Sequence, residues 1–245
     1  MQDGTLDNLI NRNSKPFPKG SESLLFHGFC RMHKSFVESL RSFGGCDDYV
    51  QKIVRWDCNK LWECFVKVSK PMKSGFEVLN HADLWMNNFL FKTDALGKPF
   101  DAILIDFQGS YWGSPSGDLI YFLITSIHDD FKVNHFDNLV EFYHGELVTS
   151  LKKLKYDKPI PTSSELHVDI QEMGYFTCMC IMFILFICKY DDANVMSIDT
   201  VMNNDDEAAR KMMKTIYRNK NYKKAVTLWL PFLNERGFLD TMISD

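Results

Sequence analysis

The sequence lacks the features that mark nucleic-acid-binding and secreted proteins. Its 28 Lys and Arg residues stand against 32 Asp and Glu, which gives a net charge of −4, and no long basic run is present. It has no Asn-x-Ser/Thr acceptor site, and the N-terminal residues Met1 to Thr5 are polar, unlike a signal peptide. Phosphate backbones are bound by clustered Lys and Arg. We therefore expect no nucleic-acid partner and a cytoplasmic location.

Membrane-length apolar runs and metal-binding cysteine pairs are also missing. The uncharged run between Glu172 and Lys189 has sixteen residues, whereas a helix that spans a bilayer needs about 20. The seven cysteines are an odd number, and Cys178 and Cys180, spaced C-x-C within this run, have no second pair at metal-ligand spacing. We expect a buried core helix here, no membrane span, and reduced thiols in the core.

What is present predicts a mainly α fold with a small β hairpin. With 245 residues, 45% of them hydrophobic, the chain can bury one substantial core. Residues 1–20 show little periodicity and should be a loose lead-in to a domain over 21–245. Apolar residues at three- and four-residue steps predict helices, and short β-rich runs predict strands. The expected helices are 21–43, 47–67, 118–126, 135–154, 164–189, 204–218 and 220–236, and the expected strands are 76–79, 88–91 and 102–105.

The most informative polar pattern follows the first predicted strand. It reads His81-x-Asp83-x-x-x-x-Asn88, and a later apolar strand ends in Asp106. An Asp can accept a hydroxyl proton, while an Asn and a second Asp can offer oxygens to magnesium. A hairpin between them would place Asn88 and Asp106 at neighbouring strand ends. The pattern predicts a phosphotransferase catalytic loop; a coincidental polar loop is the alternative.

With its flanking residues, this pattern resembles the ecdysteroid kinase-like family, also called CHK kinase-like proteins, in the choline kinase and aminoglycoside phosphotransferase group. The motifs that carry the resemblance are Leu79 to Phe91, Ile105 to Gln108, and Gly113 to Leu123. Similarity extends over 21–245, through the apolar helix at 173–189. The resemblance implies the C-terminal lobe of a protein-kinase-like fold, which phosphorylates a small-molecule hydroxyl with ATP and Mg²⁺.

The resemblance also implies roles for individual residues. Asp83 would be the catalytic base, and Asn88 and Asp106 would hold magnesium. His81 would brace the loop backbone, and Asp118 would cap a helix and pin the loop.

Two other residues are assigned more loosely. Gln108 could contact a metal-bound water or the substrate. Trp85 could line the acceptor site, although a core aromatic is the commoner fate of such a residue.

The sequence departs from the family pattern in two features, one residue and one segment. Ala82 replaces the usual glycine, which would cost about 1 kcal/mol if the backbone there has a positive φ. Residues 1–75 contain no G-x-G-x-x-G loop and no strand lysine for the nucleotide phosphates. We therefore expect the nucleotide-binding N-terminal lobe to be absent from this chain.

Three functions remain open at this point. The first is a truncated ATP-dependent kinase for an ecdysteroid or another lipophilic alcohol. The second is an inactive C-terminal lobe that acts as a binding or scaffold module, with a partner covering the exposed lobe interface. The third, a metal-dependent hydrolase, lacks a dedicated nucleophile and base and ranks last.

Overall fold

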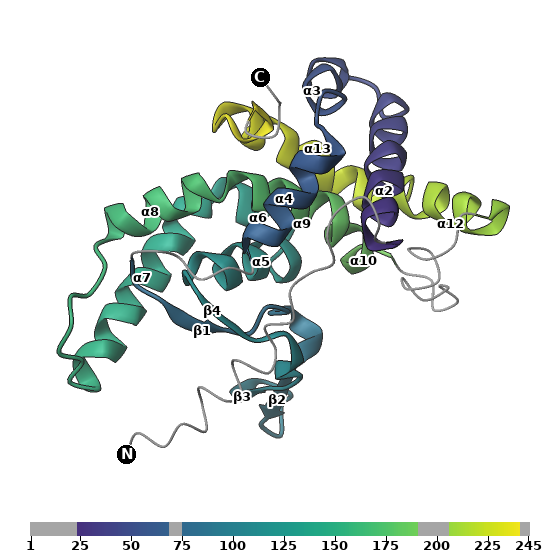
Figure 1. Cartoon of the computed structure of the whole chain (residues 1–245). Coiled ribbons are helices and arrows are strands. Elements are labelled where there is room, and N and C mark those ends of the chain that lie inside the picture. Colours follow the sequence, from purple (N-terminus) through teal and green to yellow (C-terminus); the bar gives the residue numbers. More distant parts are fainter. Residues whose placement is uncertain (1–23, 69–74, 191–205, 241–245) are drawn as a thin grey trace.

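The computed structural model describes residues 24–68, 75–190 and 206–240, and within them the chain is mainly helical (Figure 1). The helices are α2 (Leu24–Arg41), α3 (Asp47–Ile53), α4 (Cys58–Val68), α5 (Ser116–Ser126), α6 (Asp129–Asn134), α7 (Phe136–Lys153), α8 (Ser163–Glu172), α9 (Gly174–Phe183), α10 (Leu185–Cys188), α12 (Glu207–Tyr217) and α13 (Lys220–Glu235). Short 3-10 helices are η2 (Met86–Asn88), η3 (Phe107–Gly109) and η4 (Phe238–Asp240). The predicted lead-in at 1–20 lies outside the described residues.

Helix α9 lies at the centre of the core. It packs against α2, α4, α5, α8, α13 and η4, and nearly all of its residues are buried. The prediction of a buried helix here is therefore confirmed, but the single helix expected over 164–189 is wrong. The chain breaks at Met173 and Ile184 into α8, α9 and α10.

Gly174 shows how closely this break is packed. A Cβ on Gly174 would come within 2.4 Å of the buried ring of Phe238, so only glycine allows η4 to lie this close. No helix within residues 24–68, 75–190 and 206–240 combines the length and the apolar character that crossing a membrane requires.

The helix predicted over 47–67 is also two helices. The Asp57 carboxylate accepts hydrogen bonds from the backbone N–H groups of Asn59 and Lys60 at 2.8 and 3.0 Å, which starts α4 as a new helix. Just before it, the buried Trp56 donates its Nε1–H to the Leu239 carbonyl at 2.8 Å. This bond to the other end of the chain fixes the connection between α3 and α4.

Two small antiparallel sheets lie below the helices. Strands β2 (Phe89–Thr93) and β3 (Pro99–Leu104) form the predicted hairpin, with Phe89 opposite Leu104. Strand β1 (Val78–Asn80) overlaps the strand predicted over 76–79 and pairs with β4 (Tyr111–Gly113). Strand β4 was not predicted, because a run of three residues that ends in Gly and is followed by Ser-Pro is typical of a turn. The β1–β4 pair lies between the hairpin and the helices (Figure 1).

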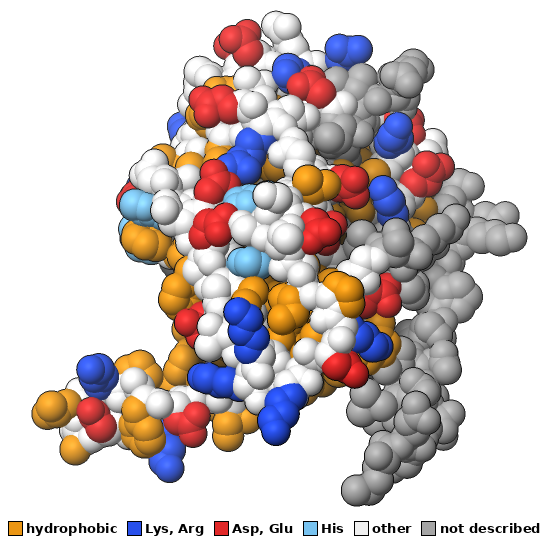
Figure 2. All heavy atoms as spheres, turned by 90° about the vertical axis from the view of Figure 1, so that its left-hand side faces the viewer, with side chains coloured by type: hydrophobic (Ala, Val, Ile, Leu, Met, Phe, Trp, Pro, Cys, Tyr) orange, Lys and Arg blue, Asp and Glu red, His pale blue; other side chains and the backbone are white. Residues whose placement is uncertain are grey.

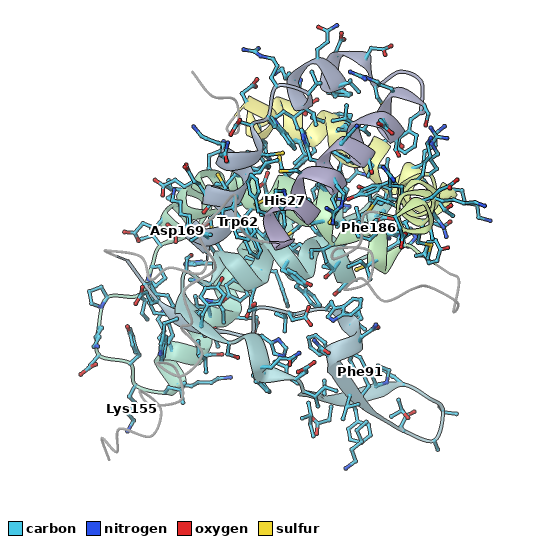
Figure 3. The ribbon with its side chains drawn as sticks, turned by 45° about the vertical axis from the view of Figure 1, so that its right-hand side comes forward. His27, Trp62, Phe91, Lys155, Asp169 and Phe186 are labelled. Carbon is cyan, nitrogen blue, oxygen red and sulfur yellow. The ribbon has the colours of Figure 1, made fainter. Side chains whose placement is uncertain are left out.

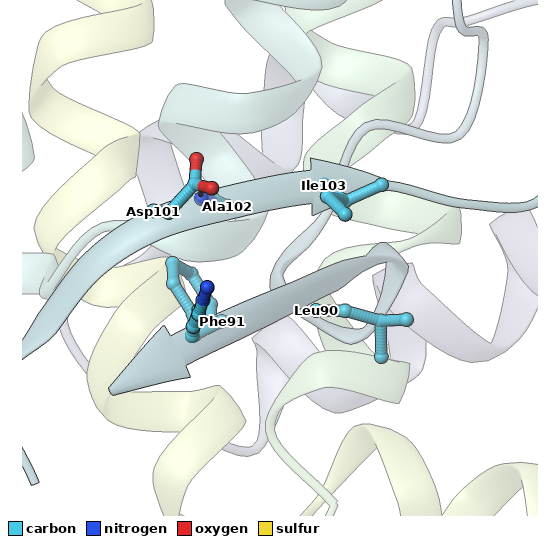
Figure 4. A pocket seen from close by; sticks show the side chains of 6 residues that line it. Leu90, Phe91, Asp101, Ala102 and Ile103 are labelled. Atoms are coloured by element: carbon cyan, nitrogen blue, oxygen red, sulfur yellow. Dashed lines mark hydrogen bonds between the residues drawn. The ribbon is translucent and has the colours of Figure 1, made fainter. Parts of the chain in front are cut away.

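The hairpin projects from the body and is largely exposed. Its base is held where the ring of Phe89 meets that of Phe122 on α5, with centroids 5.6 Å apart. Beyond this contact it extends as an arm that carries hydrophobic and charged side chains, with Phe91 well away from the helices (Figures 2 and 3). The exposed apolar side chains are Leu90, Phe91, Leu96, Phe100 and Ile103. A hollow on the arm is lined by Leu90, Phe91, Lys92, Asp101, Ala102 and Ile103, and none of the predicted catalytic residues borders it (Figure 4).

Candidate active site

The loop that carries the predicted catalytic residues runs from β1 to β2 and is tied to the start of α5. The Asp118 carboxylate accepts the backbone N–H groups of His81 at 2.5 Å and Ala82 at 2.9 Å. In return the Asn80 Oδ1 accepts from the Asp118 backbone N–H at 3.3 Å. Asp118 therefore contacts the loop as expected, but it is the third residue of α5 and does not cap that helix, whose preceding residue is Pro115.

Asp118 is partly buried, and this affects its ionisation. Burial raises the pKa of this carboxyl above its usual value, although the two N–H groups from His81 and Ala82 act in the opposite direction. The two hydrogen bonds from His81 and Ala82 are what the Asp118 carboxylate contributes to the loop: they tie the loop backbone to α5.

Two residues of the site have left-handed backbone conformations. Ala82 has φ 72° and Asp106 has φ 66°. Ala82 therefore meets the condition under which alanine in place of glycine costs free energy. Asp tolerates this region better than most residues, and at Asp106 it turns the chain from β3 into η3.

Both ring nitrogens of His81 are taken up by backbone groups. The Nε2–H donates to the Ile105 carbonyl at 2.7 Å, and Nδ1 accepts the Asp83 N–H at 3.3 Å. The ring also lies against Phe107, with centroids 4.7 Å apart. His81 therefore connects the loop that holds Asp83 to the segment that holds Asp106, and neither nitrogen is left to move a proton.

The carboxylate of Asp83 is held from two sides. Its Oδ2 accepts from the Asn88 side-chain amide at 3.0 Å, and its Oδ1 accepts from the Tyr121 hydroxyl at 2.7 Å. The Asn88 amide nitrogen also donates to the Asp83 carbonyl at 2.8 Å. Asp83 and Asn88 are thus brought into direct contact, as the sequence pattern predicts.

Asp106 lies next to Asn88 through the hairpin. The Ile105 N–H donates to the Asn88 carbonyl at 3.0 Å, which places Asp106, the next residue, near Asn88 at the start of β2. The Asp106 carboxylate is exposed and accepts from the Gln108 side chain at 3.3 Å. The three predicted residues are thus gathered at one end of the hairpin.

The side-chain oxygens at this end of the hairpin are suitable ligands for magnesium. Asn88 uses both amide hydrogens on Asp83, which leaves its side-chain oxygen as the ligand atom, and Asp106 adds an exposed carboxylate. In the described part of the chain no group of three or more His, Cys, Asp or Glu residues is arranged around a metal position. Mg²⁺ is typically bound by one or two such protein ligands, with phosphate oxygens and water completing the octahedron.

Trp85 lies against the core, which is the environment of a core aromatic and not of a residue that lines an open substrate site. It is half-buried and packs against the hydrophobic core. The neighbouring Met86 and the Phe107 that follows Asp106 are instead 43% and 51% exposed. Met86 lies three residues after Asp83 and Phe107 directly follows Asp106, so both expose apolar surface on the segments that carry these carboxylates.

Sequence reasoning missed Tyr121 altogether. Tyr121 lies 38 residues after Asp83, within the apolar run Leu119 to Leu123. A tyrosine in such a run is predicted to be a core aromatic. The one available signal was its position three residues after Asp118, which puts both side chains on the same face of α5.

Comparison with known proteins identifies the family. The model of the ecdysteroid kinase-like family matches residues 7–156, which is 150 of the 245 residues and includes every predicted site residue. The match begins upstream of the expected residue 21, and the resemblance expected after residue 156 lies outside it. No curated protein and no solved structure matches the chain. Because the match covers more than half of the sequence, the chain belongs to the ecdysteroid kinase-like family.

Proposed function

We propose that this chain is a phosphotransferase that uses ATP and magnesium to phosphorylate a hydroxyl group of a small molecule. The observation that carries the proposal is the Asp83 carboxylate, held by Asn88 at 3.0 Å beside the hairpin end that presents Asp106. A base next to two magnesium-type ligands is the arrangement that phosphoryl transfer needs. Membership of a kinase-like family supports the same reaction class.

In this proposal Asp83 is the general base. It accepts the proton of the acceptor hydroxyl as that oxygen attacks the γ-phosphorus, and ADP leaves. Asn88 and Asp106 would hold the magnesium, which neutralises charge on the phosphates when bound. His81 and Asp118 keep the loop in place through backbone hydrogen bonds, and Gln108 orients the Asp106 carboxylate.

The acceptor that fits best is a lipophilic alcohol. Met86, three residues after Asp83, and Phe107, directly after Asp106, both expose apolar surface. Burying such surface against an apolar substrate is favourable by about 25 cal/mol per Å². An ecdysteroid, which the family name indicates, is an alcohol of this kind.

A cytoplasmic location agrees with this reaction. All seven cysteines are free, and Cys46, Cys178 and Cys180 are buried. Disulfides are rare where the surroundings are reducing, so unpaired thiols support a reducing compartment.

Substitution of the carboxylates tests the proposal. Asp83→Asn should lower kcat by roughly 10²–10⁴-fold, the usual contribution of a general base. Asp106→Ala should abolish magnesium-dependent transfer of phosphate from ATP to ecdysone, followed with radiolabelled ATP. Asp101→Asn is the matched control, because Asp101 is an exposed acid on the same hairpin and bonds only its neighbour's N–H among the described contacts. Unchanged turnover in both site variants would refute the assignments.

A second candidate is a binding module without catalysis. In the described part of the chain, the residues before Val78 form the helices α2, α3 and α4 and supply no strand to cover a nucleotide. The exposed apolar side chains of the hairpin also suit a surface that a partner covers. Ecdysone binding by the wild-type chain without any phosphate transfer would favour this candidate.

A further inference from the structure

Helix α5 contacts the catalytic loop through two side chains, not one. Asp118 binds the loop backbone at His81 and Ala82. Tyr121, one turn later on the same face, reaches the Asp83 carboxylate with a hydroxyl–oxygen distance of 2.7 Å. The same rigid element therefore fixes both the path of the loop and the direction of its acidic side chain.

The two donors to Asp83 come from separate elements. Tyr121 on α5 binds Oδ1, and Asn88 in η2 binds Oδ2. Rotation of the carboxylate about its Cβ–Cγ bond would break at least one of these bonds. An ionised carboxylate has about four lone-pair positions, so a position remains on each oxygen for an acceptor hydroxyl.

Tyr121 is suited to hold a carboxylate and not to exchange protons with it. Only 8% of the residue is exposed, and α5 packs directly against the central helix α9. Burial, together with the hydrogen bond to Asp83, raises the pKa of the Tyr121 phenol far above its usual range. The hydroxyl therefore stays protonated at physiological pH and acts as a permanent donor.

From this geometry we propose that Tyr121 is a positioning residue that, with Asn88, holds the Asp83 carboxylate in the orientation in which it receives the acceptor's proton. The inference rests on the phosphotransferase function proposed above. In that reaction the acceptor O–H bond breaks and its proton goes to Asp83. The acceptor oxygen bonds to the γ-phosphorus as the bond to the ADP oxygen breaks. Tyr121 keeps its own proton throughout.

A pair of Tyr→Phe variants of the full chain tests the proposal. Tyr121→Phe removes only the hydroxyl and should lower kcat for phosphate transfer from Mg·ATP to ecdysone by about 10–100-fold, since a misdirected catalytic group costs about that much. The KM values for ATP and ecdysone should stay within about twofold, because Tyr121 contacts neither in this mechanism. Tyr222→Phe is the matched control. It removes another buried hydroxyl, bonded to the Ile181 carbonyl at 3.0 Å in the core, and should leave kcat unchanged.

The outcomes separate this inference from the proposed function. A wild-type kcat in Tyr121→Phe, or an equal loss in Tyr222→Phe, would overturn the positioning role while the phosphotransferase stands. A wild-type chain that transfers no phosphate overturns the phosphotransferase and the positioning role together. A double-mutant cycle of Tyr121→Phe with Asp83→Ala, measured by urea unfolding, reports the contact without any activity. Coupling between the two sites is expected, and its absence would overturn the contact itself.

Discussion

At the scale of single residues, Ala82 is the clearest departure from what local sequence preference would choose. Its φ of 72° places the Cβ close to the following carbonyl, a strain of about 1–2 kcal/mol for an L-residue. Two residues that are distant in the sequence constrain Ala82. The Asp118 carboxylate accepts the Ala82 N–H, and Gly109 lies so close that a Cβ added to it would be 3.3 Å from the Cβ of Ala82. Tertiary contacts therefore impose the conformation.

Replacing Ala82 with glycine should stabilise the fold. We expect Ala82→Gly to raise the free energy of unfolding by about 0.5–1 kcal/mol, because relief of the left-handed strain exceeds the added freedom of the unfolded chain. Ala102→Gly is the control, since Ala102 lies in β3 and has no positive φ. Ala102→Gly should lower the free energy of unfolding by about 0.5–1 kcal/mol. Urea unfolding followed by circular dichroism measures both, and a loss in Ala82→Gly would show that the loop relaxes the strain in another way.

The sequence predicted the polar residues of the site but not what holds them. Asp83, Asn88 and Asp106 are recognisable because their chemistry and spacing form a local pattern. Tyr121 is not recognisable, because its role arises from the way α5 packs beneath the loop. A tyrosine hydroxyl in an apolar run gives no local sign of which distant oxygen it will meet.

At the scale of elements, helix α6 is anchored by charges of which only Asp129 and Lys132, spaced i,i+3, are close in the sequence. Lys132 is fully buried, bonds the Ile124 carbonyl at the end of α5, and lies 2.8 Å from Asp129. Lys189, at the end of α10, lies 2.7 Å from the other oxygen of Asp129. The Asp129 carboxylate thus joins α6 to the end of α10, and Lys132 joins α6 to α5.

Loss of this carboxylate should be costly. Asp129→Asn is expected to lower the free energy of unfolding by about 3–5 kcal/mol, because it leaves the buried Lys132 without its counter-charge. Asp130→Asn is the control in the next position. Asp130 pairs with Lys224 at the surface, at 3.3 Å with both side chains at least half exposed, so its loss should stay within about 0.5 kcal/mol. Equal effects in the two variants would contradict the anchoring role.

The same carboxylate should make stability depend on pH. Burial alone raises the pKa of Asp129, but Lys132 and Lys189 outweigh it and hold the pKa below the unfolded value of 3.8. The unfolded chain then binds the proton more tightly, so the stabilisation is complete above pH 3.8 and is lost as pH falls through the lower folded pKa. Unfolding curves of the wild type should show this acid loss, and those of Asp129→Asn should lack this component.

Element boundaries were predictable only where the signal is local. Asp57 is a normal helix start that could have split the helix predicted over 47–67. The bond from Trp56 to Leu239, which fixes that junction, joins residues 183 positions apart and has no local sign. At the break before α9, Phe238 packs on Gly174, a contact between residues far apart in the sequence that also has no local sign.

At the scale of the whole molecule, the site and its support come from different parts of the chain. The family match ends at residue 156, near the end of α7. The helix against which α5 packs is α9, which lies beyond the match and is almost wholly buried. The matched segment therefore contains the predicted site residues, and the later helices complete the core that holds α5 in place.

The whole chain should bind nucleotide weakly. Within the described residues, the elements before Val78 are the helices α2, α3 and α4, so we expect the contacts to Mg·ATP to come from Asn88, Asp106 and the exposed hairpin. Magnesium keeps much of its water and adds few protein ligands, so we expect a Kd of about 1 mM or weaker. Isothermal titration calorimetry of the 245-residue chain with ATP and excess MgCl₂ measures it, with Asp106→Ala and a magnesium-free titration as controls. Both controls should weaken binding further, since each removes the bridge between protein and phosphate. A micromolar Kd that persists in Asp106→Ala would contradict the prediction, because it would place the main nucleotide contacts away from the hairpin end.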